Sequence, residues 1–221
     1  MIKTIFCDFY GTLAAEDDDV ISAIVAHICR TCAASPQDVA AYWWRRFSAL
    51  CAASFGGGFR TQRDLERQSL RDTLTRFGSP EDAAALCEPQ FSFWERPPIF
   101  PDTKAFLAGC PVPVVIVSNI DTSDLTRALY FHGLNPAGSV TSEDARSYKP
   151  RGEIFALALR RFGLAPEEVV HLGDSVSNDV WGARAAGIAS VWINRQGKPQ
   201  PPEVERQAAD LQEALPMLMI Y

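Results

Sequence analysis

Near its N-terminus the chain reads Ile2-Lys3-Thr4-Ile5-Phe6-Cys7-Asp8-Phe9-Tyr10-Gly11-Thr12-Leu13, and this stretch decides the fold. Residues 2–7 form an apolar run with the length and β-branched content of a buried strand. The run ends at an acid, Asp8, and Gly11 then permits a sharp reversal of the chain. In an open α/β sheet, a carboxylate at the carboxyl end of a strand lies where such sheets bind ligands. Taken alone, Asp8 is explained equally well as a residue that only ends the strand.

The segment after this strand predicts helices and no strands. Its first residues, 14–19, are an acidic connector, and negative charge is favourable at a helix N-terminus. Ser35 and Thr61 are expected N-caps, Gly78 is an expected helix end, and Ser79-Pro80 is a further expected start. Four helices are therefore expected, over residues 20–34, 36–53, 62–77 and 80–93, and together they predict a small helical bundle.

Beyond a proline-rich linker at residues 96–101, strands and helices alternate. Strands are expected over residues 112–117, 139–141, 169–172 and 188–193, and helices over residues 102–108, 123–131, 152–162, 178–186 and 203–215. This alternation predicts an α/β fold, a doubly wound parallel sheet of Rossmann-like type that is covered on both faces. We expect residues 1–14 and 100–221 to form this core domain, and residues 15–99 to form an inserted helical domain.

Polar residues end three of the expected strands: Asp8, Ser118 and Asp174. Because the carboxyl ends of parallel strands share one edge of the sheet, these side chains are expected to meet. Lys149 precedes a proline, which biases it to an extended conformation, and Asp179 lies where the next helix begins. Several carboxylates that face one lysine cannot all stay ionised without help. A divalent cation resolves this conflict, and Mg²⁺ suits one or two carboxylates plus a substrate phosphate.

This arrangement predicts phosphoryl transfer through Asp8. The Asp8 carboxylate is expected to attack phosphorus and to form an aspartyl-phosphate, which water then hydrolyses. Mg²⁺ and Lys149 are expected to neutralise the phosphoryl oxygens, while the Ser118 hydroxyl and nearby backbone N–H groups hold them. Each residue also has a simpler interpretation: Ser118-Asn119 as a turn, Lys149 as a surface lysine, and Asp174 as the end of a strand.

The order of these residues resembles the haloacid dehalogenase superfamily of hydrolases. The first motif of that family, D-x-D-G-T, is similar to residues 8–12, with Tyr10 in place of the second Asp. The second motif, a strand that ends in Ser or Thr, resembles Ser118-Asn119. The third resembles Lys149-Pro150, and the fourth, G-D-x-x-x-x-D, resembles residues 173–179. The resemblance implies that the inserted helices are a cap, which closes over the site and selects the substrate.

The resemblance also implies roles for particular residues. These are Asp8, Tyr10, Ser118 and Lys149 as catalytic residues, Thr12 and Asn119 as substrate-binding residues, and Asp8, Asp174, Asp179 and the Tyr10 backbone carbonyl as ligands of Mg²⁺. In the family's phosphatases, the second Asp of the first motif is the general acid and base. The phenol of Tyr10 can donate a proton but is a poor base at neutral pH, so we expect Tyr10 to limit phosphatase efficiency.

A second function stays open, because the D-x-Y-G-T form is typical of the family's metal-independent 2-haloacid dehalogenases. Halide leaves without a proton, and a cap arginine typically helps to bind the substrate in these enzymes. Arg45 and Arg46 are the candidates here, with a solvated helix face as the alternative. Asp174 argues against this function, because such dehalogenases typically carry uncharged residues at that motif. We rank a Mg²⁺-dependent phosphatase for a small phosphorylated metabolite first, a 2-haloacid dehalogenase second, and a catalytically weak protein that binds a phosphorylated ligand third.

Composition limits the partners. The net charge of −6, without a basic block, argues against nucleic acid, and no apolar run is long enough for a membrane span. Asp8 interrupts the first apolar run too early for a signal peptide. Six scattered cysteines, including Cys29 and Cys32 as expected helix-packing thiols, favour a reduced, cytoplasmic setting. We expect a small-molecule anionic substrate, a monomer or homodimer, and a structural role for His171 inside its strand.

Overall fold

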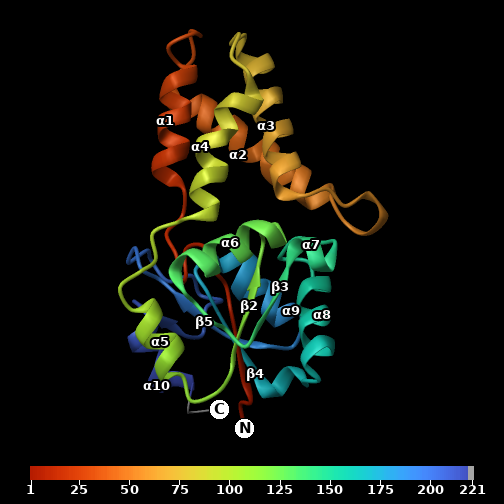
Figure 1. Ribbon diagram of the computed structural model, residues 1–221, viewed down its shortest axis with the longest axis vertical. Coiled ribbons are helices and arrows are strands. Elements are labelled where there is room, and N and C mark those ends of the chain that lie inside the picture. The colour runs from red at the N-terminus through yellow and green to blue at the C-terminus, as the bar shows by residue number, and fades with distance from the viewer. Residues whose placement is uncertain (219–221) are drawn as a thin grey trace.

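The computed structural model describes residues 1–218, and its centre is a six-stranded parallel sheet (Figure 1). The strand order is β3-β2-β1-β4-β5-β6, so β1 lies in the middle. Ile5 of β1 is paired with Val114 on one side and with Val170 on the other. The strands are β1 (Thr4–Cys7), β2 (Val114–Ser118), β3 (Gly138–Thr141), β4 (Val169–Gly173), β5 (Ala189–Ile193) and β6 (Gln207–Ala208). The predicted doubly wound α/β fold is confirmed.

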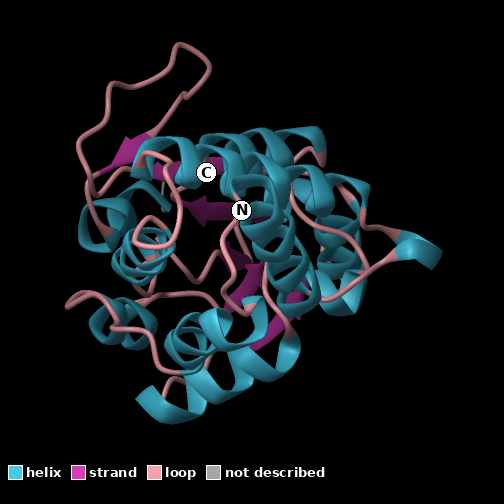
Figure 2. Cartoon of the chain, turned by 90° about the horizontal axis from the view of Figure 1, so that it is seen from above, coloured by secondary structure: helices cyan, strands magenta, loops and turns pink. Residues whose placement is uncertain are grey.

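Helices cover both faces of this sheet (Figure 2). Successive side chains of a strand point to opposite faces, so Ile5 and Cys7 pack in one apolar cluster and Phe6 packs in another. The first cluster includes side chains of α5, α6 and α10, and the second includes side chains of α8 and α9. These helices, with the short α7, are α5 (Thr103–Gly109), α6 (Thr122–His132), α7 (Ser142–Ala145), α8 (Glu153–Phe162), α9 (Gly182–Ala185) and α10 (Leu211–Met217).

Four further helices form a cap that stands on one end of the core (Figure 1). They are α1 (Asp18–Ile28), α2 (Pro36–Ala53), α3 (Gln62–Phe77) and α4 (Ala83–Glu95). The side chains of Ser35 and Thr61 accept hydrogen bonds from the first turns of α2 and α3, as predicted for N-caps. Gly78 ends α3 in the left-handed conformation, with φ of 68°. Local sequence chemistry thus sets the ends of these helices.

The chain enters and leaves the cap through two linkers that run side by side. The backbone N–H of Ala15 donates to the carbonyl of Pro98 at 2.8 Å, and Ala14 forms an isolated β-bridge with Ile99. Both linkers therefore pass close to the end of β1, where Asp8 lies. The residue-level division into a core of residues 1–14 and 100–221 and a cap of residues 15–99 stays a prediction.

Two cap helices have other ends than the sequence predicts. α1 ends at Ile28 and not at residue 34, because the Ile28 carbonyl accepts hydrogen bonds from both the backbone and the hydroxyl of Thr31. α4 begins after Asp82 and not at Ser79-Pro80, because the Asp82 carboxylate accepts from the backbone N–H groups of Ala84 and Ala85. In both cases a polar side chain a few residues away competes successfully for the terminal backbone groups.

Two predicted helices of the core are also wrong in part. The segment expected as a helix over residues 203–215 first forms β6 beside β5, and α10 begins only after Asp210, whose side chain accepts from the Glu213 N–H at 2.8 Å. The helix expected over residues 178–186 is split into a π-helical turn, Val176–Trp181, and the short α9. Pairing with β5 sets the structure of the first segment, and the π-helical turn sets that of the second. The local periodicity of the sequence indicates neither.

All six cysteines are free thiols. Within residues 1–218, no helix combines the length and the apolar character that crossing a bilayer requires.

Candidate active site

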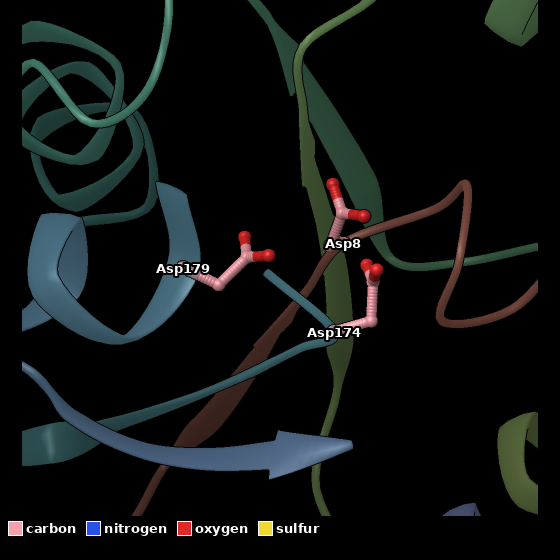
Figure 3. Close-up of side chains that lie close together, drawn as sticks. All are labelled: Asp8, Asp174 and Asp179. Atoms are coloured by element: carbon pink, nitrogen blue, oxygen red, sulfur yellow. The ribbon is translucent and has the colours of Figure 1, made fainter. Parts of the chain in front are cut away.

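Three carboxylates meet at the carboxyl edge of the sheet. Asp8 follows β1, Asp174 follows β4, and Asp179 lies in the π-helical turn after β4. One ligand atom from each lies within 4.8 Å of the others, and Figure 3 shows the three side chains directed toward a common space. Asp8 and Asp179 are 6% and 1% exposed, so this charge is concentrated where water screens it poorly.

Lys149 is the cation that faces this cluster. Its Nζ donates to Asp8 Oδ1 at 2.7 Å, to Asp179 Oδ1 at 2.6 Å and to the carbonyl of Val117 at 3.0 Å. Burial alone would lower the pKa of this ammonium, but Asp179 and Asp8 outweigh burial and raise the pKa of Lys149 above its usual value. The lysine therefore stays charged at the floor of the site.

Asn119 holds the backbone of Lys149 in place. Its Oδ1 accepts from the Lys149 N–H at 2.7 Å, and its Nδ2 donates to the Lys149 carbonyl at 3.1 Å. Both ends of the amide are therefore used within the protein. The predicted role of Asn119 in binding substrate stays a prediction, and the contact seen in the structure is one that aims the lysine.

Two glycines allow the carboxylates to approach so closely. Gly11 has φ of +84°, and a Cβ at this position would lie 2.3 Å from Asp174 Cγ. A Cβ at Gly173 would lie 2.2 Å from Asp179 Cγ. Both distances are far inside van der Waals contact, so the site needs glycine at both positions.

Replacing Gly173 by Ala is expected to destabilise the protein by about 1–3 kcal/mol, because the added methyl group forces the Asp179 loop away from the strand end. Thermal unfolding measures this loss. Gly109→Ala is the control, because a Cβ at Gly109 meets no atom within 4 Å. Equal unfolding temperatures for the two variants would contradict the packing shown here.

The charges of the cluster are only partly balanced. Burial raises the pKa of Asp8, against the opposing effect of Lys149, and burial together with Asp8 and Asp179 raises the pKa of Asp174 well above its usual value. Burial acts in the same direction on Asp179, but Lys149 and His171 outweigh it and lower its pKa to about 2. Three carboxylates thus share one buried lysine, and Asp174 is left with the least compensation. The donor set fits a divalent cation with oxygen ligands.

Ser118 and Thr12 also contact the carboxylates. Ser118 is buried at the end of β2, and its hydroxyl forms a hydrogen bond with Asp8 that favours the ionised form. The Thr12 hydroxyl lies 3.4 Å from Asp174 Oδ1, at the long end of the hydrogen-bond range, and the Thr12 side chain is fully buried. The structure thus brings six of the sequence-predicted residues together in one connected set: Asp8, Thr12, Ser118, Lys149, Asp174 and Asp179.

A family model for haloacid dehalogenase-like hydrolases matches residues 2–187. The chain belongs to this family of hydrolases. A phosphoserine phosphatase of Thermus thermophilus is 34% identical over 181 residues, which cover 77% of this chain and 70% of the relative. An (S)-2-haloacid dehalogenase of Pseudomonas fluorescens is 27% identical over 198 residues, 86% of this chain and 83% of the relative. The solved L-2-haloacid dehalogenase of Xanthobacter autotrophicus shares the fold, with a TM-score of 0.76 at 20% identity over 99% of this chain and 98% of that one.

Tyr10 of this hydrolase points its hydroxyl toward the cap. The phenol donates a hydrogen bond to the backbone carbonyl of Trp94 in α4. Burial, followed by the charges of Asp124 and Asp17, raises the pKa of Tyr10 well above its usual value. The hydroxyl is therefore protonated and donates a hydrogen bond to the Trp94 carbonyl. The backbone carbonyl of Tyr10, which is the predicted metal ligand, takes no part in this hydrogen bond. Its predicted catalytic role stays a prediction.

The two cap arginines lie on α2 in different surroundings. Arg46 forms an ion pair with Asp72 of α3, with Nε and Oδ2 2.5 Å apart, and Arg45 is exposed. Neither has a recorded contact with the carboxylate cluster within residues 1–218. Their assignment to substrate binding stays a prediction.

Sequence reasoning missed one residue next to the cluster. The Nε2 atom of His171 lies 2.9 Å from Asp179 Oδ1, and the ring is fully buried in β4. We predicted a structural role for this histidine, and the contact adds a specific one: it orients the same carboxylate oxygen that Lys149 holds. The signal was present, since His171 is the only polar side chain in an otherwise apolar strand.

Proposed function

We propose that this hydrolase is a divalent-metal-dependent phosphatase that acts on a small phosphate ester through an aspartyl-phosphate at Asp8. The observation that carries the proposal is the position of Asp174. One ligand atom of this carboxylate lies within 4.8 Å of those of Asp8 and Asp179, but Lys149 contacts only those two and not Asp174. Such a group adds unfavourable charge unless a cation shares the site. The 34% identical phosphoserine phosphatase supports the reaction class.

The residues of the site divide the work of this reaction. Asp8 would attack phosphorus, and the Lys149 ammonium, held at Asp8 Oδ1, would neutralise negative charge on the phosphoryl group. Asp8, Asp174, Asp179 and the backbone carbonyl of Tyr10 would hold Mg²⁺, which supplies further charge neutralisation for the phosphoryl oxygens. The Ser118 hydroxyl, which forms a hydrogen bond with Asp8, would bind one of these oxygens.

A second candidate, 2-haloacid dehalogenation, is favoured by Tyr10 and by the relative from Pseudomonas fluorescens. Carbon–halogen cleavage at Asp8 would need no proton for the leaving group and no metal. Asp174 is the observation against it, because a further carboxylate repels an anionic haloacid.

Asp174→Asn separates the two functions. For a phosphatase, the variant is expected to release phosphate from p-nitrophenyl phosphate at least about 100-fold more slowly, because a metal ligand is lost. For a dehalogenase, halide release from 2-chloropropionate is expected to be unchanged or faster. Both assays are run with Mg²⁺ and with a chelator. Phosphate release in the presence of the chelator would overturn the proposal, and so would halide release in its presence. Binding of a phosphate mimic without turnover in either assay would leave only a binding function.

A further inference from the structure

The proposed reaction needs a proton donor that Tyr10 does not provide. When the leaving group is an alkoxide, an acid must protonate it, and a base must later activate water. The Tyr10 hydroxyl already donates to the Trp94 carbonyl, and burial holds its proton firmly. Another group that can exchange a proton near Asp8 is therefore required.

A cavity of about 380 Å³ reaches Asp174 of the carboxylate cluster beside the linker that enters the cap. Asp174 and Gly11 form its inner wall. Ala15 and Glu16 of the linker, with Asp18 and Asp19 at the start of α1, form a second wall. Residues 192–196 and Lys198, at and after the end of β5, form a third. The space is large enough for several water molecules or for a small alcohol. The cavity therefore leads to Asp174, and one ligand atom of Asp174 lies within 4.8 Å of one of Asp8.

Glu16 is the carboxylic acid in this cavity whose side chain is not otherwise used. Within residues 1–218, no hydrogen bond or ion pair engages its carboxylate. Asp18 and Asp19, which also line the cavity, belong to the first turn of α1, where negative charge stabilises the helix. Glu16 precedes that helix and lines the cavity from the linker.

The surroundings of Glu16 favour proton exchange. Glu16 is exposed to the cavity, and partial desolvation, followed by the charges of Asp18, Asp8 and Asp17, raises the pKa of its carboxyl group against the opposing charge of Lys198. Glu16 and Asp174 line the same cavity, and one ligand atom of Asp174 lies within 4.8 Å of one of Asp8. The charge of Glu16 in turn contributes to the raised pKa of Asp174. A carboxyl group that titrates closer to neutrality is a better acid–base catalyst at physiological pH.

We propose that Glu16 is the general acid and base of this hydrolase, in the role that Tyr10 cannot fill. The inference rests on the proposed phosphatase function. In the first step, an Asp8 oxygen forms a bond to phosphorus, the phosphorus–oxygen bond to the alcohol breaks, and the Glu16 carboxylic acid gives its proton to the departing oxygen. In the second step, the Glu16 carboxylate takes a proton from water while the water oxygen attacks phosphorus. The bond to Asp8 breaks, and inorganic phosphate and the protonated Glu16 are formed.

The test is Glu16→Gln, assayed with p-nitrophenyl phosphate and with glycerol 2-phosphate. Nitrophenolate leaves without a proton, so the first step stays fast while the second slows, and a burst of about one nitrophenolate per enzyme is expected before slow turnover. With glycerol 2-phosphate both steps are slowed, so no burst occurs and kcat falls by about 10²–10⁴-fold. The part of the pH dependence of kcat that comes from the Glu16 carboxyl group is expected to be absent in the variant, and Glu16→Asp is expected to restore part of the activity.

Asp19→Asn is the matched comparison, because it removes one negative charge from the same cavity. It is expected to change the hydrolysis rates of both substrates by the same factor and to give no burst. The proposal for Glu16 would be overturned if Glu16→Gln hydrolysed both substrates at rates within threefold of the wild type and showed no burst. The phosphatase function would then stay in place. A wild-type enzyme that hydrolyses neither ester would overturn both, and the two failures are therefore distinguishable. The Glu16 side chain makes no hydrogen bond or ion pair among residues 1–218, so the variant is expected to unfold at the wild-type temperature.

Discussion

Asp8→Asn is expected to lower kcat by about 10⁴-fold or more while the protein stays folded. The amide oxygen of asparagine is a far weaker nucleophile than a carboxylate, so the covalent step is lost under either the phosphatase or the dehalogenase function. The variant keeps the shape of the side chain, and Lys149 keeps Asp179 as a partner at 2.6 Å. The expected loss is therefore a loss of chemistry and not of architecture.

The stability of this variant is a second part of the same prediction. Burial raises the pKa of Asp8, which means that its ionised form is costly in the folded protein. A neutral amide removes that cost, so the unfolding temperature is expected to stay the same or to rise. Glu203→Gln, an exposed change of the same charge, is the control. Residual activity above about 1% with either substrate would show that Asp8 is not the nucleophile.

The centre of the fold could be predicted because its signals are local. The apolar run of residues 2–7 has one plausible structure, a buried strand, and its alternation with later helices leaves a parallel sheet as the simplest arrangement. Ser35 and Thr61 likewise act on backbone groups three residues away, so their N-caps could be read directly. The strand ends then had to share one edge, and this placed Asp8 and Asp174 together.

The predictions that failed depend on contacts between distant segments. Residues 207–208 form a strand only because β5 lies beside them, and no residue near them in the sequence carries that information. Contacts of two predicted site residues also depend on distant segments: the hydroxyl of Tyr10 turns toward Trp94, 84 residues away, and Arg46 pairs with Asp72 on the neighbouring helix. The roles of these residues stay predictions, and sequence spacing could not give the direction in which their side chains point.

The cap also contains a buried acid that sequence reasoning did not single out. Glu66 of α3 is 4% exposed, and burial, with a smaller effect of Asp17, raises its pKa to about 8. Gln90 of α4 faces it, and the buried Oε1 atom of Gln90 has no hydrogen-bond partner, whereas its Nε2 donates to Asp17 at 2.8 Å. Burial outweighs the hydrogen bonds of Trp43 and Gln90, which favour the ionised form of Glu66, so a neutral carboxylic acid fits the site better than a carboxylate. The protonated Glu66 is then available as a donor for the orphaned Gln90 oxygen.

Glu66→Gln is therefore expected to stabilise the protein in a pH-dependent manner. Because the folded pKa of Glu66 lies above its unfolded value, the folded wild type binds an extra proton, and its stability falls as pH rises from about 4.5 to about 8. A glutamine stays neutral throughout and can donate to the same Gln90 oxygen. The difference between the proteins is expected to be small at pH 5 and to reach on the order of 2–4 kcal/mol at pH 8.

Thermal unfolding of both proteins between pH 5 and pH 9 measures this difference, which corresponds to an unfolding temperature about 5–10 °C higher for the variant at pH 8. Glu88→Gln on α4 is the matched control, because that side chain is 65% exposed and its change is expected to be independent of pH. Glu66 has no contact with the carboxylate cluster, so catalytic activity at pH 7 is expected to be that of the wild type. A stability difference that stays constant with pH would mean that Glu66 is ionised in the folded cap, and the orphaned Gln90 oxygen would then need another donor.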